Sequence, residues 1–561
     1  MPRTADRRIA LVSTADGLTA IELDAEGGET GRTLLTMERA SSWVRAAEEE
    51  SSPRWVIRSA RELYPALLQS GVLLGRTHDL VLCHALLRDT ALLDEPLPAS
   101  AAWAATSVEQ AVPTLFDALP TDAGDPVDAV LTQYRDQLRA LSAAPDGRLA
   151  LLCAAESAGG LIAEEMRAAG LPWDAAEHDR ILVEALGERT AGGVPAKMAR
   201  LAQQVRAELG DDRLNLDSQP KLLRALHRVG VLAESTSRWE LASYDHPAVP
   251  PLLAYKRLAR LLSANGWAWL ADWVHEGRFR PVYIPGGVVT GRWASAGGGA
   301  LQLPRVLRPA VRADPGWTLV VADVAQLEPR MLAAMARDGA MARAARGSDL
   351  YAGVVASGAV STREEAKYAV LGAMYGATTG DSGRLVPRLR KVFPRAMHLV
   401  DDAARIGEDG GVVSTWLGRS SPRPPAAWRE EQAAASGADA SPALVLQSQR
   451  RARDRGRFTR NFVVQGTAAE WSLVWLAEIR HRLRALPSAE RPATASGPFA
   501  HQAHLAFFLH DEVILHVPAE AGEQAAEAVR EAAAVATARL FGSFPLDVPL
   551  DLRIAPTAAK Q

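Results

Sequence analysis

Cysteine is scarce in this sequence: only Cys83 and Cys153 occur among 561 residues. Two cysteines can build neither a disulfide framework nor a four-cysteine zinc site, so any bound metal must be held by carboxylates. Long apolar runs are also missing. None approaches the roughly 18 residues of a membrane span, and the N-terminal stretch MPRTADRRIA lacks the apolar core of a signal peptide. We therefore expect a cytoplasmic protein without a membrane partner.

A strong net charge is absent as well. The formal charge is -3, which excludes a uniformly basic nucleic-acid-binding surface but not a local one. Such a local patch exists at Gln449–Arg460, QRRARDRGRFTR. The hydrophobic content of 48% and the charged content of 23% are typical of a folded globular protein. The length predicts roughly three or four domains.

The order of strand-like and helical patterns divides the chain. Residues 9 to 146 alternate strand-like runs (IALVST, LTAIEL, RWVIRS) with helical stretches at Val108–Leu119 and Val127–Leu141, which predicts a small α/β domain. Residues 149 to 280 are almost continuously helical. In the remainder we expect helices between 331 and 406, a loop at Gly418–Leu446, a helix at 461–486, an apolar strand-like segment at 504–518 and a last helix at 521–541. The amphipathic helices expected in the first helical block are Ala154–Ala169, Lys197–Leu209, Gln219–Val229 and Leu252–Ala264.

The stretch Gly316–Arg330, GWTLVVADVAQLEPR, places a carboxylate at the end of a buried strand. Thr318–Ala322 is apolar and β-branched, and the apolar spacing after Gln326 becomes helical. Asp323 thus lies at a strand-to-helix junction, where it could cap the helix or bind a metal ion. A second carboxylate site is Phe507–Leu515, FFLHDEVIL, where three polar residues interrupt strand-like flanks. Adjacent acids in such a run predict either a hairpin tip or a cation site.

A helix is predicted from a capping-box pattern, in which Ser361 pairs with Glu364 or Thr362 with Glu365. Four residues follow at steps of four and share one helix face. They place two cations near the helix N-terminus and a phenol at its other end, an arrangement that suits phosphates and a flat ring. A solvated charged turn followed by core contacts is the alternative. The four residues are Arg363, Lys367, Leu371 and Tyr375.

Taken in order, these motifs resemble those of family A DNA polymerases, the DNA polymerase I family. DVAQLEPR at 323–330 resembles motif A (D-Y-S-Q-I-E-L-R), Arg363-x3-Lys367-x7-Tyr375-Gly376 resembles motif B, and His510-Asp511-Glu512 resembles motif C. Two further segments resemble DNA contacts of the family. They are Thr290-Gly-Arg292 with Leu301-Gln302, and Arg457-x3-Asn461-x3-Gln465-Gly-Thr-Ala-Ala.

The resemblance implies a template-directed DNA polymerase of replication or repair that binds primer-template DNA and deoxynucleoside triphosphates (dNTPs) with two Mg²⁺ ions, and a monomer is expected. Metal would be held by Asp323, Asp511 and the carbonyl of Val324, with Glu512 as an auxiliary acid and Lys367 as a proton donor to pyrophosphate. Nucleotide binding is implied for Gln326, Glu328, Tyr351, Arg363, Lys367, Leu371 and Tyr375. DNA contacts are implied for Thr290, Arg292, Gln302, Arg457, Asn461, Gln465 and His510.

The implied architecture is a multidomain α/β protein, in which a ribonuclease H-like, 3′-5′ exonuclease-like domain precedes a right hand of palm, fingers and thumb. We expect no 5′ nuclease domain. The first domain matches the family in position, but the acids of an exonuclease metal site are missing and Asp79 matches a structural position, so we expect no proofreading. The domains are 1–145 (exonuclease-like), 146–204 (helical connection), 205–285 (thumb), 286–340 (palm), 341–455 (fingers, with a loop at 418–446) and 456–561 (palm).

The sequence departs from the family at several site positions. Val324-Ala325 replaces Tyr-Ser, Pro329 replaces Leu, Leu371 replaces an aromatic residue and Tyr351 replaces a phosphate-binding histidine. The usual asparagines around Gln302 are missing. Two alternatives remain: a single-subunit RNA polymerase, which Glu328 disfavours because that glutamate blocks a ribose 2′-hydroxyl in family A, and a catalytically silent DNA-binding protein, which the intact carboxylates disfavour.

Overall fold

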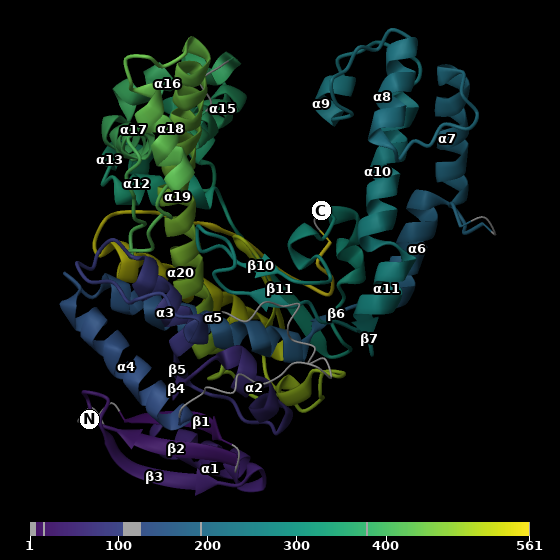
Figure 1. Cartoon of the computed structure of the whole chain (residues 1–561). Coiled ribbons are helices and arrows are strands. Elements are labelled where there is room, and N and C mark those ends of the chain that lie inside the picture. The colour runs from purple at the N-terminus through teal and green to yellow at the C-terminus, as the bar shows by residue number, and fades with distance from the viewer. Residues whose placement is uncertain (1–6, 15–16, 105–124, 191–192, 377–379, 560–561) are drawn as a thin grey trace. The chain divides into compact units, whose positions relative to one another are not determined.

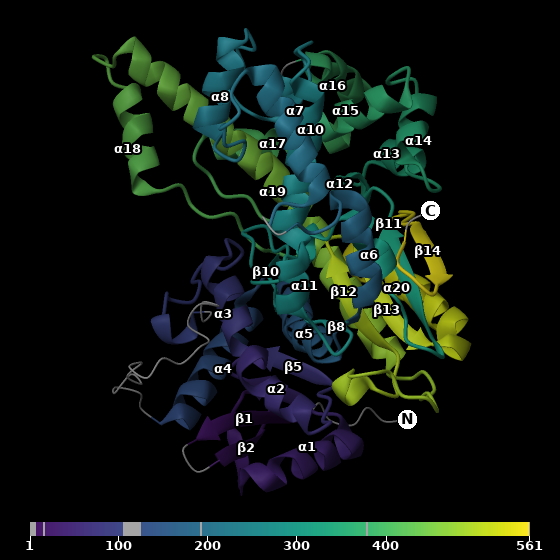
Figure 2. The same ribbon diagram turned by 90° about the vertical axis from the view of Figure 1, so that its right-hand side faces the viewer.

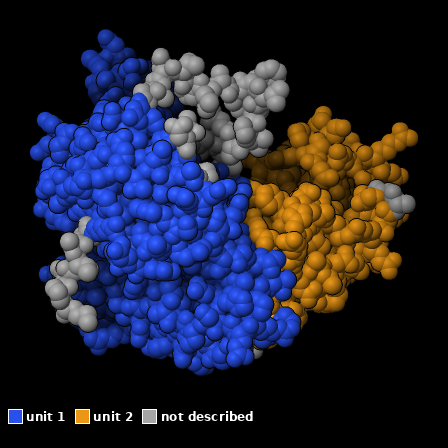
Figure 3. All heavy atoms as spheres, turned by 90° about the horizontal axis from the view of Figure 1, so that it is seen from below, with its two compact units in different colours: residues 1–170, 282–296, 315–555 blue, residues 171–281, 297–314, 556–561 orange. Residues whose placement is uncertain are grey.

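The structure is a computed structural model that describes residues 7–14, 17–104, 125–190, 193–376 and 380–559. The helix predicted at Val108–Leu119 lies outside these residues. The chain divides into two compact units, coloured separately in Figure 3. Unit 1 comprises residues 1–170, 282–296 and 315–555, and unit 2 comprises 171–281, 297–314 and 556–561. No helix among the described residues is long and apolar enough to cross a membrane.

Unit 1 begins with a five-stranded mixed sheet of order β3-β2-β1-β4-β5. Alternate residues of β1 point to opposite faces. Ile9 and Leu11 pack with helices α1 and α2, whereas Ala10 and Val12 pack with α4. Figures 1 and 2 label these helices and β1. The α/β prediction for the N-terminal part is therefore confirmed. Its elements are β1 (Arg8–Thr14), β2 (Gly17–Leu23), β3 (Glu29–Leu35), α1 (Met37–Ser51), β4 (Arg54–Ile57), α2 (Ala60–Gln69), β5 (Arg76–Asp79), α3 (Leu80–Asp89), η1 (Ala101–Trp103), α4 (Pro126–Ala143) and α5 (Arg148–Ala169).

Unit 2 is mainly helical, as its amphipathic segments predict, and has its own apolar core. Ser218 precedes α8 at the N-cap position and Pro220 lies in the first turn, although the Ser218 side chain makes no capping hydrogen bond. The elements of unit 2 are β6 (Leu171–Pro172), α6 (Ala175–Leu186), α7 (Ala196–Leu209), α8 (Gln219–Arg228), α9 (Arg238–Leu241), α10 (Val249–Asn265), α11 (Trp267–Trp273), β7 (Val274–His275), β8 (Arg278–Phe279), η3 (Ala300–Gln302) and η4 (Arg305–Ala310).

Unit 1 also contains a four-stranded antiparallel sheet of order β12-β13-β11-β14. The strand predicted around Asp323 is β11 (Trp317–Val324), and the segment predicted at 504–518 is a hairpin of β12 (His504–Leu509) and β13 (Glu512–Pro518). Helix α20 (Gly522–Phe541) packs on this sheet through Gly522, which lies against Thr318 and Ile554. The fourth strand is β14 (Leu550–Ala555). The neighbouring elements in the sequence of unit 1 are β9 (Tyr283–Ile284) and β10 (Ala294–Ser295), which pair with each other, α12 (Leu327–Met335), η5 (Gly497–Phe499) and η6 (Ala519–Ala521).

Helices α12 to α17 and the middle of α19 share one apolar core in unit 1. The loop prediction for 418–446 is wrong in part, because Ala426–Ala435 forms helix α18, and the predicted start of the next helix at 461 is also wrong, because α19 begins at Pro442. Alanine and arginine favour helix strongly enough to outweigh the scattered proline and serine. The helices of this region are α13 (Gly339–Ala344), α14 (Leu350–Ala356), α15 (Arg363–Tyr375), α16 (Gly380–Val392), α17 (Pro394–Glu408), α18 (Ala426–Ala435) and α19 (Pro442–Leu483).

Candidate active site

The two predicted carboxylates meet at one end of the antiparallel sheet. Asp323 is the penultimate residue of β11, and its register partner on β13 is Glu512. Asp511 lies in the β12–β13 turn, and the next residue of β11, Val324, donates its N–H to the Asp511 carbonyl over 3.0 Å. The alternative of Asp323 as a helix cap is wrong, because Gln326 occupies the N-cap position of α12. The fold therefore brings an acid at the end of β11 close to an acid in the β12–β13 turn.

Asp511 is electrostatically crowded. Its burial, and secondarily the neighbouring Asp323, raises the pKa of its carboxyl to about 7. Carboxylate oxygens are ligands that Mg²⁺ prefers, and a cation would relieve the repulsion between Asp323 and Asp511. Among the described residues, no group of three or more His, Cys, Asp or Glu side chains could hold a metal ion. The chain's donors at this place thus suit a hard cation that takes its remaining ligands from water or a substrate.

The backbone is unusual beside both acids. Gln326 has φ of 48° and His510 has φ of 59°, in the left-handed region that non-glycine residues rarely adopt. The Gln326 side chain is held in place, because its Oε1 accepts from the Leu350 N–H at 3.2 Å and from Arg330 at 3.3 Å. Such conformations persist only where the surroundings impose them, and they are concentrated at functional sites.

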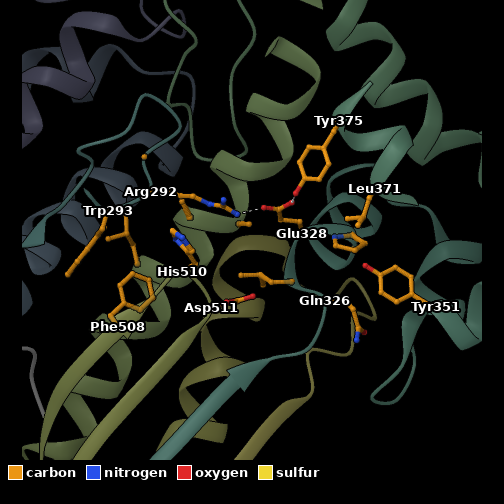
Figure 4. A pocket seen from close by; sticks show the side chains of 16 residues that line it. Arg292, Trp293, Gln326, Glu328, Tyr351, Leu371, Tyr375, Phe508, His510 and Asp511 are labelled. Carbon is orange, nitrogen blue, oxygen red and sulfur yellow. Dashed lines mark hydrogen bonds and ion pairs between the residues drawn. The ribbon is translucent and has the colours of Figure 1, made fainter. Parts of the chain in front are cut away.

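Glu328 is the centre of a small polar network, drawn above Asp511 in Figure 4. The Tyr375 hydroxyl donates to its Oε2 over 2.5 Å, and Arg292 forms an ion pair with its Oε1. Burial, followed by the hydrogen bond to Glu328, raises the pKa of the Tyr375 phenol, so the phenol stays a donor. Arg292 comes from the connection between β9 and β10, and Tyr375 comes from helix α15, which is distant in the sequence.

This network borders a cavity of about 230 Å³. Its apolar walls and few convergent polar groups are typical of a small-molecule site. The described lining includes Leu371 and Tyr375 but not Arg363 or Lys367. The lining residues are Gly291, Arg292, Trp293, Gln326, Leu327, Glu328, Pro329, Tyr351, Leu371, Tyr375, Ala468, Ala469, Leu473, Phe508, His510 and Asp511.

Helix α15 confirms the predicted helix and settles its cap: Thr362 with Glu365 forms the capping box. Arg363 Nε donates to Asp349 Oδ2 over 2.7 Å, and its guanidinium lies 5.6 Å from the centre of the Tyr351 ring. Lys367 is exposed. Both cations therefore lie on the exposed part of the helix, N-terminal to the two residues that line the cavity.

The residues predicted to contact DNA fall in both units. In unit 1, Thr290 Oγ1 donates to Gln465 Oε1 over 2.9 Å, and Arg457 pairs with Asp454 while packing against Gly376. Asn461 is partly exposed on α19. Gln302 belongs to unit 2, where it ends η3.

Two buried charged residues near the site were not singled out from the sequence. Arg330 is fully buried and donates to the carbonyls of Ala325, Ala345, Gly347 and Asp547, which fixes the segment after β11. Glu470 of α19 accepts from Thr415 Oγ1 and from the Leu417 N–H. Arg330 ends the motif A segment, but the sequence does not show its acceptors, which range from the nearby Ala325 to the distant Asp547. Glu470 has no local sequence signal, because Thr415 and Leu417 lie far from it in the chain.

Comparisons with known proteins agree with these features. Residues 186–558 match DNA polymerase family A. The chain is 26% identical over 398 residues to the thermostable DNA polymerase I of Thermus filiformis, covering 64% of this chain and 43% of that protein. It is 28% identical over 347 residues to DNA polymerase I of Chloroflexus aurantiacus, covering 57% and 33%. The chain thus spans less than half the length of these curated relatives.

A solved structure of the POL domain of Pol1 from M. smegmatis, in complex with DNA primer-template and dNTP, has a similar fold. The TM-score is 0.67 at 19% sequence identity, and the match covers 99% of this chain and 96% of that one. The family match extends over about two thirds of the chain and includes the paired carboxylates, the Glu328 network and helix α15. This mixed α/β chain therefore belongs to DNA polymerase family A.

Proposed function

We propose that the chain is a template-directed DNA polymerase that adds deoxynucleotides to a primer 3′ end by two-metal nucleotidyl transfer. The observation that carries the proposal is the meeting of Asp323 and Asp511 beside the cavity that Glu328 borders. The curated relatives are named DNA polymerase I, and the similar solved structure is bound to DNA primer-template and dNTP. A role in replication or repair fits this activity.

We assign the parts of the chain accordingly. The antiparallel sheet would be the palm (286–340 and 456–561), and the helices of 341–455 the fingers. The helical stretch 205–285 would be the thumb, and 146–204 a connection. Residues 1–145 would be a ribonuclease H-like, exonuclease-like domain. The supporting observation is the match to the family over 186–558, together with the mixed sheet at the N-terminal end.

Asp323, Asp511 and the Val324 carbonyl would hold the Mg²⁺ ions, with Glu512 nearby. When bound, two such ions stabilise the charge on the attacking and leaving oxygens of a phosphoryl transfer. The chain's own groups then position the nucleotide. Arg363 and Lys367, on the exposed first turns of α15, would bind the triphosphate, and Lys367 would give a proton to the departing pyrophosphate.

The sugar and base would be selected in the cavity. Glu328 would exclude a ribose 2′-hydroxyl, Leu371 would pack beneath the sugar, and Tyr375 would lie against the nascent base pair. Tyr351 and Gln326 would complete the nucleotide site. The residues that would follow the DNA backbone and minor groove, which track duplex shape more than sequence, are Thr290, Arg292, Gln302, Arg457, Asn461, Gln465 and His510.

Primer extension with Mg²⁺ and either dNTPs or ribonucleoside triphosphates (rNTPs) tests the proposal. We expect extension that depends on the template and prefers dNTPs. A preference for rNTPs would favour the RNA polymerase alternative. Duplex binding without extension by either set would favour the silent DNA-binding alternative.

A further inference from the structure

The connection between β9 and β10, residues 285–293, carries Thr290 and Arg292. It is a tight turn, in which the Gly291 N–H donates to the Val288 carbonyl at 2.7 Å and the Val288 N–H donates to the Arg292 carbonyl at 3.0 Å. Two glycines in the left-handed region, Gly286 with φ of 60° and Gly291 with φ of 86°, lie near its ends. We call residues 285–293 the arginine loop, because Arg292 is the residue that reaches Glu328.

A buried ion pair lies against both of these glycines. Glu156 of α5 is 2% exposed and its Oε2 accepts from Arg419 Nη2 over 2.7 Å, while the Arg419 side chain is 14% exposed. A Cβ added at Gly286 would overlap Glu156 Oε1, and a Cβ added at Gly291 would overlap Arg419 Nε. The Glu156 carboxylate therefore touches one end of the arginine loop, and the Arg419 guanidinium touches the other.

Arg419 is itself held firmly. The segment 413–421 that carries it is bound on one side by Glu470, which accepts from the Leu417 N–H at 2.9 Å. On the other side, Thr90 Oγ1 donates to the Gly418 carbonyl at 2.9 Å, and the Ala91 N–H donates to Ser420 Oγ at 2.8 Å. The residues after helix α3 and helix α19 thus hold the segment that carries Arg419, and Glu156 binds its guanidinium.

We propose that the Glu156–Arg419 pair positions the arginine loop so that Arg292 holds Glu328 at the sugar end of the cavity. Both residues are positioning residues, since neither lines the described cavity. The inference rests on the proposed function for its consequence, which is sugar selection. Its structural part, the ordering of the loop, does not depend on catalysis.

The first test is kinetic. We expect Arg419→Met to lower the ratio of kcat/KM for dNTPs to that for rNTPs by about tenfold, since small misplacements at an active site have effects of this order or larger. In a Glu328→Ala background, the same change should cause no further loss, because positions that act through one another are not additive. A full additional loss in that background would overturn the proposal.

The matched control is Arg480→Met. Arg480 also forms a buried ion pair, with Glu165 Oε1 at 2.6 Å, far along α19 from the arginine loop. Both variants remove a buried positive charge and leave a buried carboxylate, so both should unfold at lower denaturant concentration. Only Arg419→Met should change the nucleotide preference. An equal change in Arg480→Met would show that the effect comes from lost stability, and would overturn the proposal.

The second test does not need activity. Hydrogen exchange of the amides of residues 286–293 should be faster in Arg419→Met than in the wild type, and unchanged in Arg480→Met. Unchanged exchange in Arg419→Met would contradict the positioning role even if polymerisation is confirmed. Conversely, if the wild type fails to extend primers, the proposed function is wrong while the exchange result still decides whether the pair orders the loop.

Arg419→Lys covers the case in which Arg419→Met does not fold. Lysine retains a charge for Glu156 but lacks the planar group that lies against Gly291, so this variant should fold. It should shift the preference and the exchange in the same direction by a smaller factor. If Arg419→Met does not fold, and Arg419→Lys has the wild-type nucleotide preference and the wild-type amide exchange, the proposal is overturned.

Discussion

The five-stranded and the four-stranded sheet of unit 1 each carry an aspartate whose pKa is raised to about 7, and the two residues differ in what surrounds them. Asp79 ends β5 of the N-terminal sheet, where burial raises the pKa of its carboxyl, and its oxygens accept from the Ala60 and Leu82 N–H groups at 2.7 and 3.0 Å. Asp511 lies in the turn of the β12–β13 hairpin, lines a cavity and is close to a second carboxylate, that of Asp323. A raised pKa alone therefore does not mark a site; an accessible carboxylate beside another does.

The largest expected effect comes from replacing the paired aspartates of the antiparallel sheet. Asp323→Ala or Asp511→Ala should lower primer extension by at least about a thousandfold, because the carboxylates act on the charge of the transition state. Binding of primer-template, measured by fluorescence anisotropy, should remain largely intact. Near-normal extension by either variant would refute the assignment of the active site.

Next in size is the loss of Glu328. Glu328→Ala should increase the relative use of rNTPs by about a hundredfold, because it removes the group that would meet the 2′-hydroxyl and unlinks Arg292 from Tyr375. Steady-state kinetics with matched dNTP and rNTP measures this. An unchanged preference would mean that Glu328 is not the gate, and would reopen the RNA polymerase alternative.

Glu470 provides a test by pH. Burial raises the pKa of its carboxyl to about 7 from an ordinary 4.5, so the folded state binds a proton that the unfolded state releases. The stabilisation is complete below the ordinary pKa and is lost as pH rises toward 7. Glu470→Gln should remove this slope, which amounts to a change in unfolding free energy on the order of 3 kcal/mol between pH 4 and 8. Urea denaturation at several pH values measures it. The exposed Glu520→Gln is the control, and an unchanged slope in Glu470→Gln would contradict the prediction.

Leu371→Tyr should have a smaller effect. An aromatic ring in place of Leu371 in the cavity wall would contact the sugar and offer a hydroxyl, strengthening dideoxynucleotide binding by an amount on the order of 1 kcal/mol. Competition between a dideoxynucleotide and its dNTP in primer extension measures the gain. Leu371→Met, which preserves volume without a ring, is the matched control, and an equal gain in that control would rule out the ring as the cause.

The smallest expected effect concerns Asp79 and the N-terminal sheet. If Asp79 is a structural cap, the N-terminal sheet should support no proofreading, and the intact protein should leave a mismatched primer 3′ end undegraded in Mg²⁺ or Mn²⁺. A matched 3′ end serves as the reference. Metal-dependent removal of the mismatched nucleotide, persisting in Asp323→Ala, would show that this domain is an active exonuclease.

The sequence predicts best those features that depend on neighbouring residues. The strand before Asp323, the hairpin around Asp511 and the capped helix from Arg363 all follow from local periodicity and capping, and the structure confirms them. Helix α18 was missed because proline and serine suggested a loop. The burial of Glu156 beside Arg419, and of Glu470 beside Thr415 and Leu417, could not be predicted from the sequence. Such carboxyl groups are buried only where partners that are distant in the sequence compensate them.

The left-handed backbone at Gln326 and His510 sets stability against activity at these two positions. Glycine adopts that conformation without the steric cost that a Cβ imposes, which is about 1 kcal/mol or more per residue. Selection of this protein for heat resistance alone should therefore enrich His510→Gly, and should enrich Gln326→Gly only if the relief of the backbone exceeds the loss of the hydrogen bonds from Leu350 and Arg330. Selection for copying should remove both changes, because the Gln326 and His510 side chains line the cavity. The residues found at positions 326 and 510 after laboratory evolution would thus show whether stability or copying had been selected.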